Sequence, residues 1–315
     1  MTARIIAVVG ATGAQGGGLV RAILADRSSG YTVRALTRNP ASEKAKALGA
    51  LGADVRTADA DQPDTLAPAF DGVHGVFCLT NFWEHFSPER ELAQAQAQAR
   101  AAKVAGVRHA IWSTLEDTRR WVPLSDSRMP TLMGRYKVPH FDAKGEADHF
   151  FRDLGVPTTY LLTSFYWDNF IYFGAGPKPG TDGELSLTLP MGDRPLPGIA
   201  AEDIGRCALG IFQQGPALVD KRVGIAGEHL TGNEMATALA GALGRPVRYN
   251  AVTPEQYRGF GFPGADDLGN MFQFKHDFNR DFCGPRDVAA SRALNPPLMN
   301  FAGWLTRYAK LIPLE

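Results

Sequence analysis

The sequence has few cysteines, no long apolar run and no excess of either charge. Its 315 residues include three cysteines, Cys78, Cys207 and Cys283, which lie far apart and form no metal-ligand pattern. We therefore expect no bound metal and thiols that stay reduced, as is usual in the cytoplasm.

The other two absences limit the partners of the protein. No apolar run reaches the ~18 residues that a membrane span requires, and no signal peptide is recognisable ahead of the first expected strand. The formal net charge is zero and no long basic run occurs, which argues against binding to nucleic-acid phosphates. These features predict a soluble, cytoplasmic protein that binds neither a membrane nor a nucleic acid.

Glycine, by contrast, is concentrated near the start of the chain. An unbroken apolar run over residues 5–9 is typical of a buried parallel strand, and Gly10, Gly13 and Gly16 follow it. The next apolar residues have helical spacing: Leu19, Val20, Ala22, Ile23 and Leu24. Strand, glycine turn and helix predict a dinucleotide site, where the backbone approaches a pyrophosphate at the helix N-terminus. The alternative is an ordinary turn rich in small residues.

The end of the next expected strand, residues 32–37, bears on the choice of dinucleotide. Sites that select NAD usually have an acidic residue about 20 residues after the glycine motif, to bind the ribose 2′-hydroxyl. This sequence has Arg38 there, with Arg34 earlier on the same strand. A guanidinium suits a 2′-phosphate, so the sequence favours NADP(H). A solvated arginine at the start of a loop is the alternative.

Acidic residues follow the third expected strand, residues 54–57. Asp59, Ala60 and Asp61 lie at the edge of the sheet where an open α/β fold binds its ligands. Their carboxylates either accept a hydrogen bond from adenine or act as turn and cap residues for a helix near Pro63. The residues themselves do not decide between the two.

The fourth expected strand, residues 75–79, is followed by two polar residues and then by aromatic ones. We expect Thr80 and Asn81 to contact the cofactor, because they follow the carboxyl end of a parallel strand. The aromatic residues are candidate walls of a pocket: Phe82, Trp83 and Phe86.

The whole pattern predicts an α/β fold with a Rossmann-type, doubly wound parallel sheet. Six strands are expected in the order 3-2-1-4-5-6, at residues 5–9, 32–37, 54–57, 75–79, 109–112 and 157–162. Helices are expected at residues 42–51, 88–105 and 140–154. Residues 1–164 should form this dinucleotide-binding domain, with residues 198–226 returning to it.

The remaining residues, 165–197 and 227–315, predict a smaller, interwoven C-terminal domain that closes over the substrate. A helix is expected over residues 231–243, with a capping box of Thr231 and Glu234. The aromatic stretches 260–264 and 271–274 are expected to be loops. The irregular segment 117–139 is either a lid beside the cofactor or a plain surface insertion.

Several longer motifs resemble a known family. They are GATGAQGG (10–17), TRNP (37–40), TNFWE (80–84), HFDAKGEADHFFRDLGVP (140–157), the stretch 165–170 and GFPGADDLGNMF (261–272). On these motifs the chain resembles the NmrA-like family of atypical short-chain dehydrogenases/reductases over nearly its whole length. It is most similar to the animal members that sense NADPH.

The resemblance implies a full set of cofactor contacts. The pyrophosphate lies on Gly10, Ala11, Thr12, Gly13, Ala14, Gln15 and Gly16. Arg38 binds the 2′-phosphate, and Asp59, with Ala60 beside it, lies on the adenine side. The middle of the cofactor is lined by Thr80, Asn81 and Phe82. Lys144 binds the nicotinamide ribose, and the nicotinamide end is lined by Tyr166, Trp167, Asp168 and Asn169.

The candidate catalytic residues, Lys144 and His140, depart from the wider family. Conventional short-chain dehydrogenases use Tyr-x-x-x-Lys, in which the lysine holds the ribose and helps the tyrosine to donate a proton. Here the spacing is His140-x-x-x-Lys144, which places both side chains on one helix face. Tyr136 lies one turn earlier but ahead of Pro139, out of register.

Each candidate also has a plainer interpretation. Lys144 is otherwise a solvated lysine among Asp142, Glu146 and Asp148, and His140 a first-turn residue without chemistry. The helix macrodipole and Lys144 disfavour a charged imidazolium at His140, whereas Asp142 favours it. A neutral imidazole still polarises a carbonyl. Isoflavone-reductase-like enzymes, a related branch, lack the tyrosine and rely on the lysine, so the fold permits a reductase without requiring one.

Two functions remain open at this point. The first is an NADPH-dependent reductase of a small planar or aromatic acceptor, because aromatic residues surround the expected site. The second is a non-catalytic sensor of the NADPH/NADP balance that acts through a protein partner or as a homodimer. The neutral composition announces no partner surface and favours the enzyme, whereas the resemblance favours the sensor.

Overall fold

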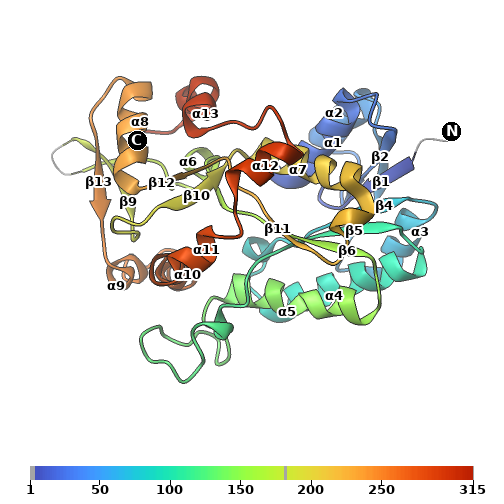
Figure 1. Cartoon of the computed structure of the whole chain (residues 1–315), viewed down its shortest axis with the longest axis horizontal. Coiled ribbons are helices and arrows are strands. Elements are labelled where there is room, and N and C mark those ends of the chain that lie inside the picture. The colour runs from blue at the N-terminus through green and yellow to red at the C-terminus, as the bar shows by residue number, and fades with distance from the viewer. Residues whose placement is uncertain (1–3, 181–182, 315) are drawn as a thin grey trace.

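The computed structural model describes residues 4–180 and 183–314 and is organised around one parallel sheet (Figure 1). Its strands are β1 (Arg4–Val8), β2 (Tyr31–Thr37), β3 (Asp54–Thr57), β4 (Gly75–Cys78), β5 (His109–Thr114), β6 (Thr158–Leu162) and β11 (Arg222–Gly224). They lie in the order β11-β6-β5-β4-β1-β2-β3 and pair in parallel throughout. The expected order of six strands is confirmed, and β11 extends the sheet beside β6.

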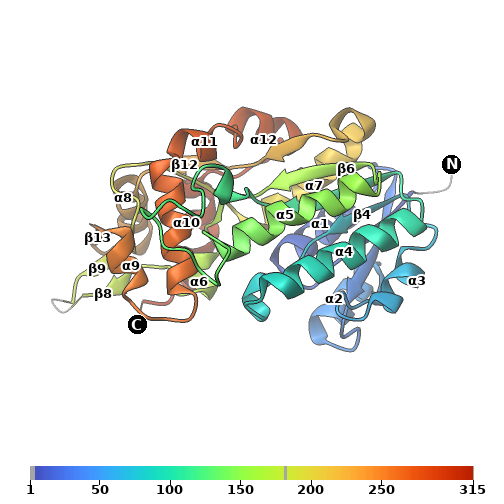
Figure 2. The same cartoon turned by 90° about the horizontal axis from the view of Figure 1, so that it is seen from below.

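Helices cover both faces of this sheet. One face carries α1 (Ala14–Ala25), α2 (Glu43–Ala50) and α7 (Ala201–Gln214); the other carries α3 (Leu66–Phe70), α4 (Pro88–Val104) and α5 (Pro139–Asp153), as Figure 2 shows for α4 and α5. Successive strand residues supply the two cores: Ile6 and Val8 face α1, and Ala7 faces the opposite layer. Helices α1 and α7 touch closely because residue 205 is glycine, where a Cβ would lie 2.0 Å from the Leu19 nitrogen.

The smaller part of the molecule lies at the left of Figure 1 and is made largely of later residues. Within the described residues it has two three-stranded sheets, ordered β12-β10-β7 and β13-β9-β8. Their strands are β7 (Phe165–Tyr166), β8 (Lys178–Pro179), β9 (Leu185–Leu189), β10 (Leu196–Ile199), β12 (Glu228–Leu230) and β13 (Val247–Ala251). The later helices are α6 (Asn169–Tyr172), α8 (Gly232–Leu243), α9 (Pro254–Arg258), α10 (Ala265–Asp277), α11 (Asn279–Cys283), α12 (Val288–Leu294) and α13 (Phe301–Tyr308).

The sequence predicted the local structure of this part correctly at one place and wrongly at another. The capping box at the start of α8 is confirmed, since Thr231 Oγ1 accepts from the Glu234 N–H and the Glu234 carboxylate accepts from the Thr231 N–H. The expectation of a loop at residues 271–274 is wrong, because they lie inside α10. Nine of the residues from 265 to 275 are buried, so apolar and polar residues do not separate into the two faces that reveal a surface helix.

The segment 117–139 is joined to the smaller part in this structure. Val122, Met129 and Val138 belong to its core. On α10, Asn270 Nδ2 donates to the backbone oxygens of Pro130 at 2.9 Å and Lys137 at 2.6 Å. These contacts anchor the segment to α10 at several points along its length.

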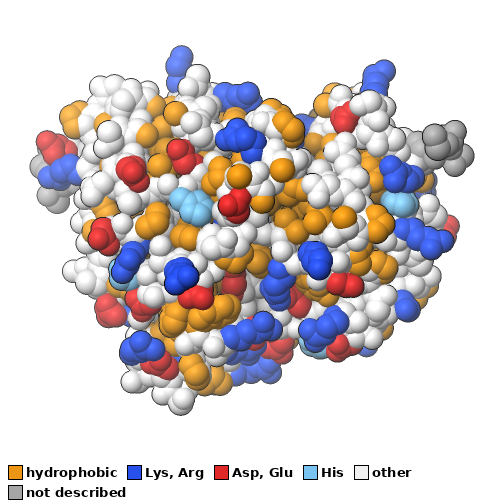
Figure 3. Space-filling model, viewed as in Figure 1, with side chains coloured by type: hydrophobic (Ala, Val, Ile, Leu, Met, Phe, Trp, Pro, Cys, Tyr) orange, Lys and Arg blue, Asp and Glu red, His pale blue; other side chains and the backbone are white. Residues whose placement is uncertain are grey.

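Two features are absent from the described residues. No described helix is both long enough and apolar enough to cross a bilayer. No cluster of three or more histidine, cysteine, aspartate or glutamate side chains that could hold a metal ion was found there either. On the face drawn in Figure 3, basic and acidic side chains are interspersed.

Candidate functional site

The glycine turn joins β1 to α1 at the carboxyl edge of the sheet. Gly10 has a φ of +64°, which L side chains rarely adopt, and a Cβ at Gly16 would lie 2.4 Å from the Gly10 oxygen. Gly13 is the N-cap of α1, and no described side chain caps this helix or places a carboxylate in its first turn. The first N–H groups of α1 are therefore suited to an anionic ligand such as a pyrophosphate.

The residues of this turn differ in what they expose. Ala11 is fully buried and donates its N–H to the Leu36 oxygen at 3.1 Å. The Gln15 side chain connects strand ends beneath the turn: Nε2 donates to Tyr166 Oη at 2.6 Å, and Oε1 accepts from Ser113 Oγ at 2.8 Å. Gly10, Thr12 and Gln15 are half-buried, and Gly13 and Ala14 are exposed. A pyrophosphate would thus meet the backbone here rather than the Gln15 side chain.

Arg38 lies just past the end of β2, where the adenosine ribose is expected. Its Nη2 donates to Glu84 Oε1 at 2.5 Å, and both side chains are about half exposed. A 2′-phosphate would compete with this carboxylate, which the sequence analysis did not identify. Arg34 cannot share the task, because it is buried and bonds to Asp54 and to the backbone oxygens of residues 69 and 71.

The acidic turn after β3 is held together by its own hydrogen bonds. Asp59 Oδ1 accepts from the Asp61 N–H at 3.0 Å, and Asp61 pairs with Arg90 and Gln94 of α4. The Arg90 and Gln94 hydrogen bonds outweigh partial burial and lower the pKa of Asp61 to about 2. Asp59 therefore acts as a turn residue here, and Ala60 beside it is half-buried. The adenine contact stays a prediction.

Lys144 projects from α5 into a buried polar group rather than into solvent. Its Nζ lies 2.6 Å from Glu91 Oε1 of α4 and donates to Thr80 Oγ1 at 2.6 Å and to the Thr80 oxygen at 2.9 Å. The Glu91 side chain is fully buried. Burial opposes its charge, but Lys144, His85 and Thr80 outweigh this and lower the pKa of Glu91 to about 2. Lys144 is thus held at the carboxyl end of β4, where Thr80 was expected to meet the cofactor.

His140 stands in the first turn of α5, as predicted, and is paired with Asp267 of α10. Nδ1 lies 2.5 Å from Asp267 Oδ1, and the His140 backbone N–H donates to Asp267 Oδ2 at 3.1 Å. Because an ionised carboxylate only accepts, Nδ1 is the donor in this pair when Asp267 is ionised. Nε2 has no hydrogen-bond partner among the described residues, and the ring lies 4.7 Å from Trp83 and 4.8 Å from Phe141 between centres.

Asp142, which was expected to influence His140, and Tyr136, which was expected to be out of register, are both engaged elsewhere. Asp142 accepts from Thr118 Oγ1 at 2.6 Å and from the Lys137 N–H at 2.7 Å, so it closes the turn that precedes α5. Burial raises the pKa of Asp142. Tyr136, the displaced tyrosine, is fully buried and stacked with Arg119 and Arg135 rather than lying beside His140. The charge that acts on His140 comes from Asp267 instead.

Three segments far apart in sequence meet at His140. They are the 3-10 turn at Phe82–Glu84, the first turn of α5 and the start of α10. Gly264, the N-cap of α10, has a φ of +85°, and a Cβ there would lie 2.9 Å from the Trp83 ring. Glycine at this position lets α10 approach closely enough for Asp267 to reach His140. Because these two residues are 127 positions apart, no local pattern could reveal their pairing.

The residues expected along the rest of the cofactor fall into two groups. Thr80 is buried and holds Lys144, Asn81 is exposed, and Phe82 is buried 6.0 Å from His140 between ring centres. Of the four at the nicotinamide end, Tyr166 meets Gln15 and Asn169 begins α6. Trp167 is 1% exposed in the core of the smaller part, and Asp168 Oδ2 caps α7 at the Ala201 N–H. The structure does not bring Trp167 to the open site, and it gives Asp168 a capping role.

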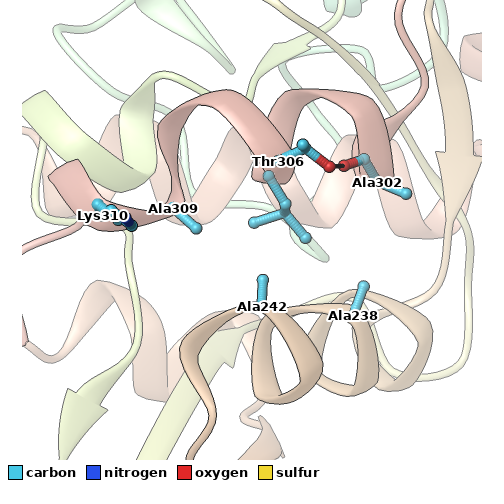
Figure 4. Close-up of a pocket in the computed structure, with 7 residues that line it drawn as sticks. Ala238, Ala242, Ala302, Thr306, Ala309 and Lys310 are labelled. Atoms are coloured by element: carbon cyan, nitrogen blue, oxygen red, sulfur yellow. Dashed lines mark hydrogen bonds between the residues drawn. The ribbon is translucent and has the colours of Figure 1, made fainter.

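A shallow groove elsewhere has no link to this chemistry. It encloses about 350 Å³ between α8 and α13, in the smaller part of the molecule (Figure 4). Its lining is mostly small and apolar: Ala238, Ala242, Ala302, Leu305, Thr306, Ala309 and Lys310. None of the residues predicted to bind a cofactor or act in catalysis lies in it.

Comparison with known proteins agrees with the fold. The NmrA-like family matches residues 2–305. The NmrA-like oxidoreductase hkm9 of Aspergillus hancockii is 26% identical, with 99% of each chain covered. The NAD(P)H azoreductase of Xenophilus azovorans is 31% identical over 85% of this chain and 86% of its own.

A solved structure extends the likeness to three dimensions. NmrA, a negative transcriptional regulator solved in complex with NADP, superposes with a TM-score of 0.78 at 25% identity, covering 98% of this chain and 95% of its own. The fold, the glycine turn and the matched residues together identify the protein as a member of the NmrA-like family.

Proposed function

We propose that the protein is an NADPH-dependent reductase of a small planar or aromatic acceptor, such as a quinone, an enone or another carbonyl compound. The observation that carries this proposal is the buried His140–Asp267 pair, which leaves Nε2 unpartnered within the described residues and surrounded by aromatic rings. A reductase needs a group that exchanges a proton with the acceptor oxygen, and a His–Asp pair beside the cofactor site is suited to that task. Binding a nucleotide alone gives no reason for it.

The residues present fit NADP(H) as the cofactor. The uncapped first turn of α1 would receive the pyrophosphate, and Arg38 would exchange Glu84 for a 2′-phosphate. The names of the relatives support the same choice, since one is an NAD(P)H azoreductase and NmrA was solved with NADP. Bound NADPH would supply a hydride.

The chain's own residues would orient the acceptor and handle the proton. Lys144, fixed by Glu91 and Thr80, would hold the nicotinamide ribose at the end of β4. Once the acceptor carbon has received the hydride, its oxygen needs one proton. His140 would donate it from Nε2 when the ring is protonated, and Asp267 would balance the charge and keep the ring oriented.

The test is NADPH oxidation against a panel of quinones, enones and aromatic carbonyl compounds. We expect turnover in the wild type, a lower rate in Lys144→Met and a lower rate in His140→Phe, which keeps a ring but loses the hydrogen bonds. NADPH deuterated on one face should transfer a single label, because the site fixes which face is presented. A panel without turnover, under conditions where NADPH is shown to bind, would overturn the proposal.

A second candidate function, redox sensing, is favoured by the likeness to NmrA, a negative transcriptional regulator. A sensor requires that NADPH and NADP stabilise different protein states. Segment 117–139, anchored to α10 by Asn270, is the place to look for such a difference. Different hydrogen-exchange patterns there with the two cofactors, in a protein that reduces no acceptor, would support the sensor and a search for its protein partner or homodimer.

A further inference from the structure

Lys275 of α10 is a buried cation that has no anionic partner in the part of the chain that the structure describes. It is 4% exposed, and its Nζ makes no hydrogen bond or salt bridge within the described residues. The nitrogen instead lies over three aromatic rings, 5.5 Å from the centre of Phe141, 5.3 Å from Phe272 and 5.1 Å from Phe282. Such cation–π contacts offset only part of the cost of removing an ammonium group from water.

The charged groups around Lys275 do not neutralise it. Arg286 and Glu116 lie nearby, but they satisfy one another through two hydrogen bonds of 2.6 and 3.0 Å. The other Arg286 hydrogens go to the backbone oxygens of Thr163 and Phe282. Burial and the Arg286 charge lower the pKa of Lys275 to about 7, although Glu116 and Cys283 act to raise it. The Glu116–Arg286 pair is neutral overall, so Lys275 is the surplus charge.

The position of Lys275 relates it to the His140 site. Asp267, Met271 and Lys275 are four residues apart, so they share one face of α10. That face meets the first turn of α5, where Asp267 binds His140 and Lys275 lies over the neighbouring Phe141. Eight residues of helix place the Cα atoms of Asp267 and Lys275 about 12 Å apart along the axis. Lys275 thus lies about two helical turns from the residue that pairs with His140.

We infer that Lys275 binds an anionic group, a carboxylate or a sulfonate, at the end of the acceptor opposite to the one that His140 contacts. This inference rests on the proposed reductase function and narrows its substrate class to aromatic acceptors that carry a negative charge. The amine gains a charged partner that the fold itself does not supply. The three rings pack against the apolar body of the acceptor.

Binding is tested without turnover, with 2-naphthoate and its neutral counterpart 2-naphthamide, on wild-type protein saturated with NADP. We expect naphthoate to bind at least tenfold more tightly than naphthamide, and Lys275→Met to abolish that preference while its affinity for naphthamide is retained. Lys103→Met, which removes an exposed lysine from α4, is the matched control and should leave the preference unchanged. Equal affinities in the wild type, or an unchanged preference in Lys275→Met, would overturn the inference.

A second measurement needs no variant and therefore covers the case in which Lys275→Met fails to fold. At pH 8 much of the free Lys275 is neutral, so an anion that stabilises the ammonium form draws a proton from the buffer. Calorimetry of wild-type protein in phosphate and in Tris should show proton uptake with naphthoate and none with naphthamide. Naphthoate binding without uptake would assign the anion to another group.

Turnover separates a failure of this inference from a failure of the reductase proposal. Anthraquinone-2-sulfonate and its neutral sulfonamide form a matched pair of acceptors. We expect a kcat/KM at least tenfold higher for the sulfonate, and a ratio near one in Lys275→Met. Reduction of both at equal rates by wild type and variant would refute the role of Lys275 and keep the reductase. Naphthoate binding that depends on Lys275, with no reduction of either quinone, would refute the reductase and keep the role of Lys275.

Discussion

The two sides of the candidate site differ in whether the protein supplies a partner for their charged and polar side chains. On the sheet side, Lys144 is matched by Glu91 at 2.6 Å and Arg38 by Glu84 at 2.5 Å. On the side formed by α10, within the described residues, Lys275 has no anionic partner and His140 Nε2 has no hydrogen-bond partner. An ion pair within the protein holds both of its side chains in place before any ligand binds. A buried polar atom left without a match gains most when a ligand supplies the partner.

The largest effect expected from this difference between the two sides is on the free energy of unfolding. Lys144→Met leaves the Glu91 carboxylate buried and without its cation, so we expect the free energy of unfolding without cofactor to fall by about 3–5 kcal/mol. Lys275→Met removes an unmatched charge and should be neutral or stabilising. Urea titration of both variants measures the difference.

The double variant Lys144→Met/Glu91→Leu is the control for this pair. It should recover much of the loss, because no uncompensated charge remains. The pKa of Glu91 is lowered to about 2, so its contribution is present above the ordinary carboxyl range and is lost as the pH falls toward 2. A single variant as stable as the wild type would place Lys144 on a solvated face after all.

The next effect concerns catalysis on the α10 side. His140→Phe should lower kcat by about 100-fold, the lower end for loss of a general acid. Asp267→Asn keeps the shape but loses the charge, and should lower kcat less while altering the pH–rate profile. Asp266→Asn, a neighbouring exposed position on α10, is the control and should change neither. An unaltered pH–rate profile in Asp267→Asn would mean that the His140–Asp267 pair has only a structural role.

A smaller effect is expected on cofactor choice at the sheet side. Arg38→Ala should weaken NADPH binding by about 1.5–3 kcal/mol and leave NADH nearly unchanged, because only NADPH carries the 2′-phosphate. Isothermal titration with both cofactors measures this. Glu84→Gln frees the guanidinium and should tighten NADPH binding slightly. Equal losses for NADPH and NADH in Arg38→Ala would mean that Arg38 does not contact the phosphate.

The smallest effect is a pH dependence specific to Lys275. With a pKa of about 7 in the folded protein and the ordinary higher value when unfolded, the unfolded chain binds more protons between these limits. Stability should therefore rise with pH above 7, by about 1 kcal/mol between pH 7 and 8 from this group. Denaturation of wild type and Lys275→Met across this pH range isolates the contribution of Lys275 to the pH dependence of stability. The variant should lack this contribution. Parallel curves would show that Lys275 keeps its proton.

The sequence was most informative where function depends on neighbours along the chain. The glycine turn and the strand ends follow from short local patterns and the strand order from the succession of strands and helices, and the structure confirms the fold that they predict. The α8 capping box is a contact of the same local kind. The α10 helix was misjudged because it is buried on most sides, which removes the amphipathic period that marks a helix in sequence.

What the sequence alone determined is the Rossmann-type sheet, the likeness to the NmrA-like family and the placing of His140 and Lys144 on one helix face. Only the tertiary structure decided what each of these side chains pairs with: Glu91 with Lys144, Asp267 with His140, Glu84 with Arg38. It also placed Lys275 among three phenyl rings, with no carboxylate partner among residues 4–180 and 183–314. Local order follows from backbone periodicity, which a short stretch of sequence displays. Charge matching in a buried site depends on which distant segments pack together, and that is fixed only when the whole core closes.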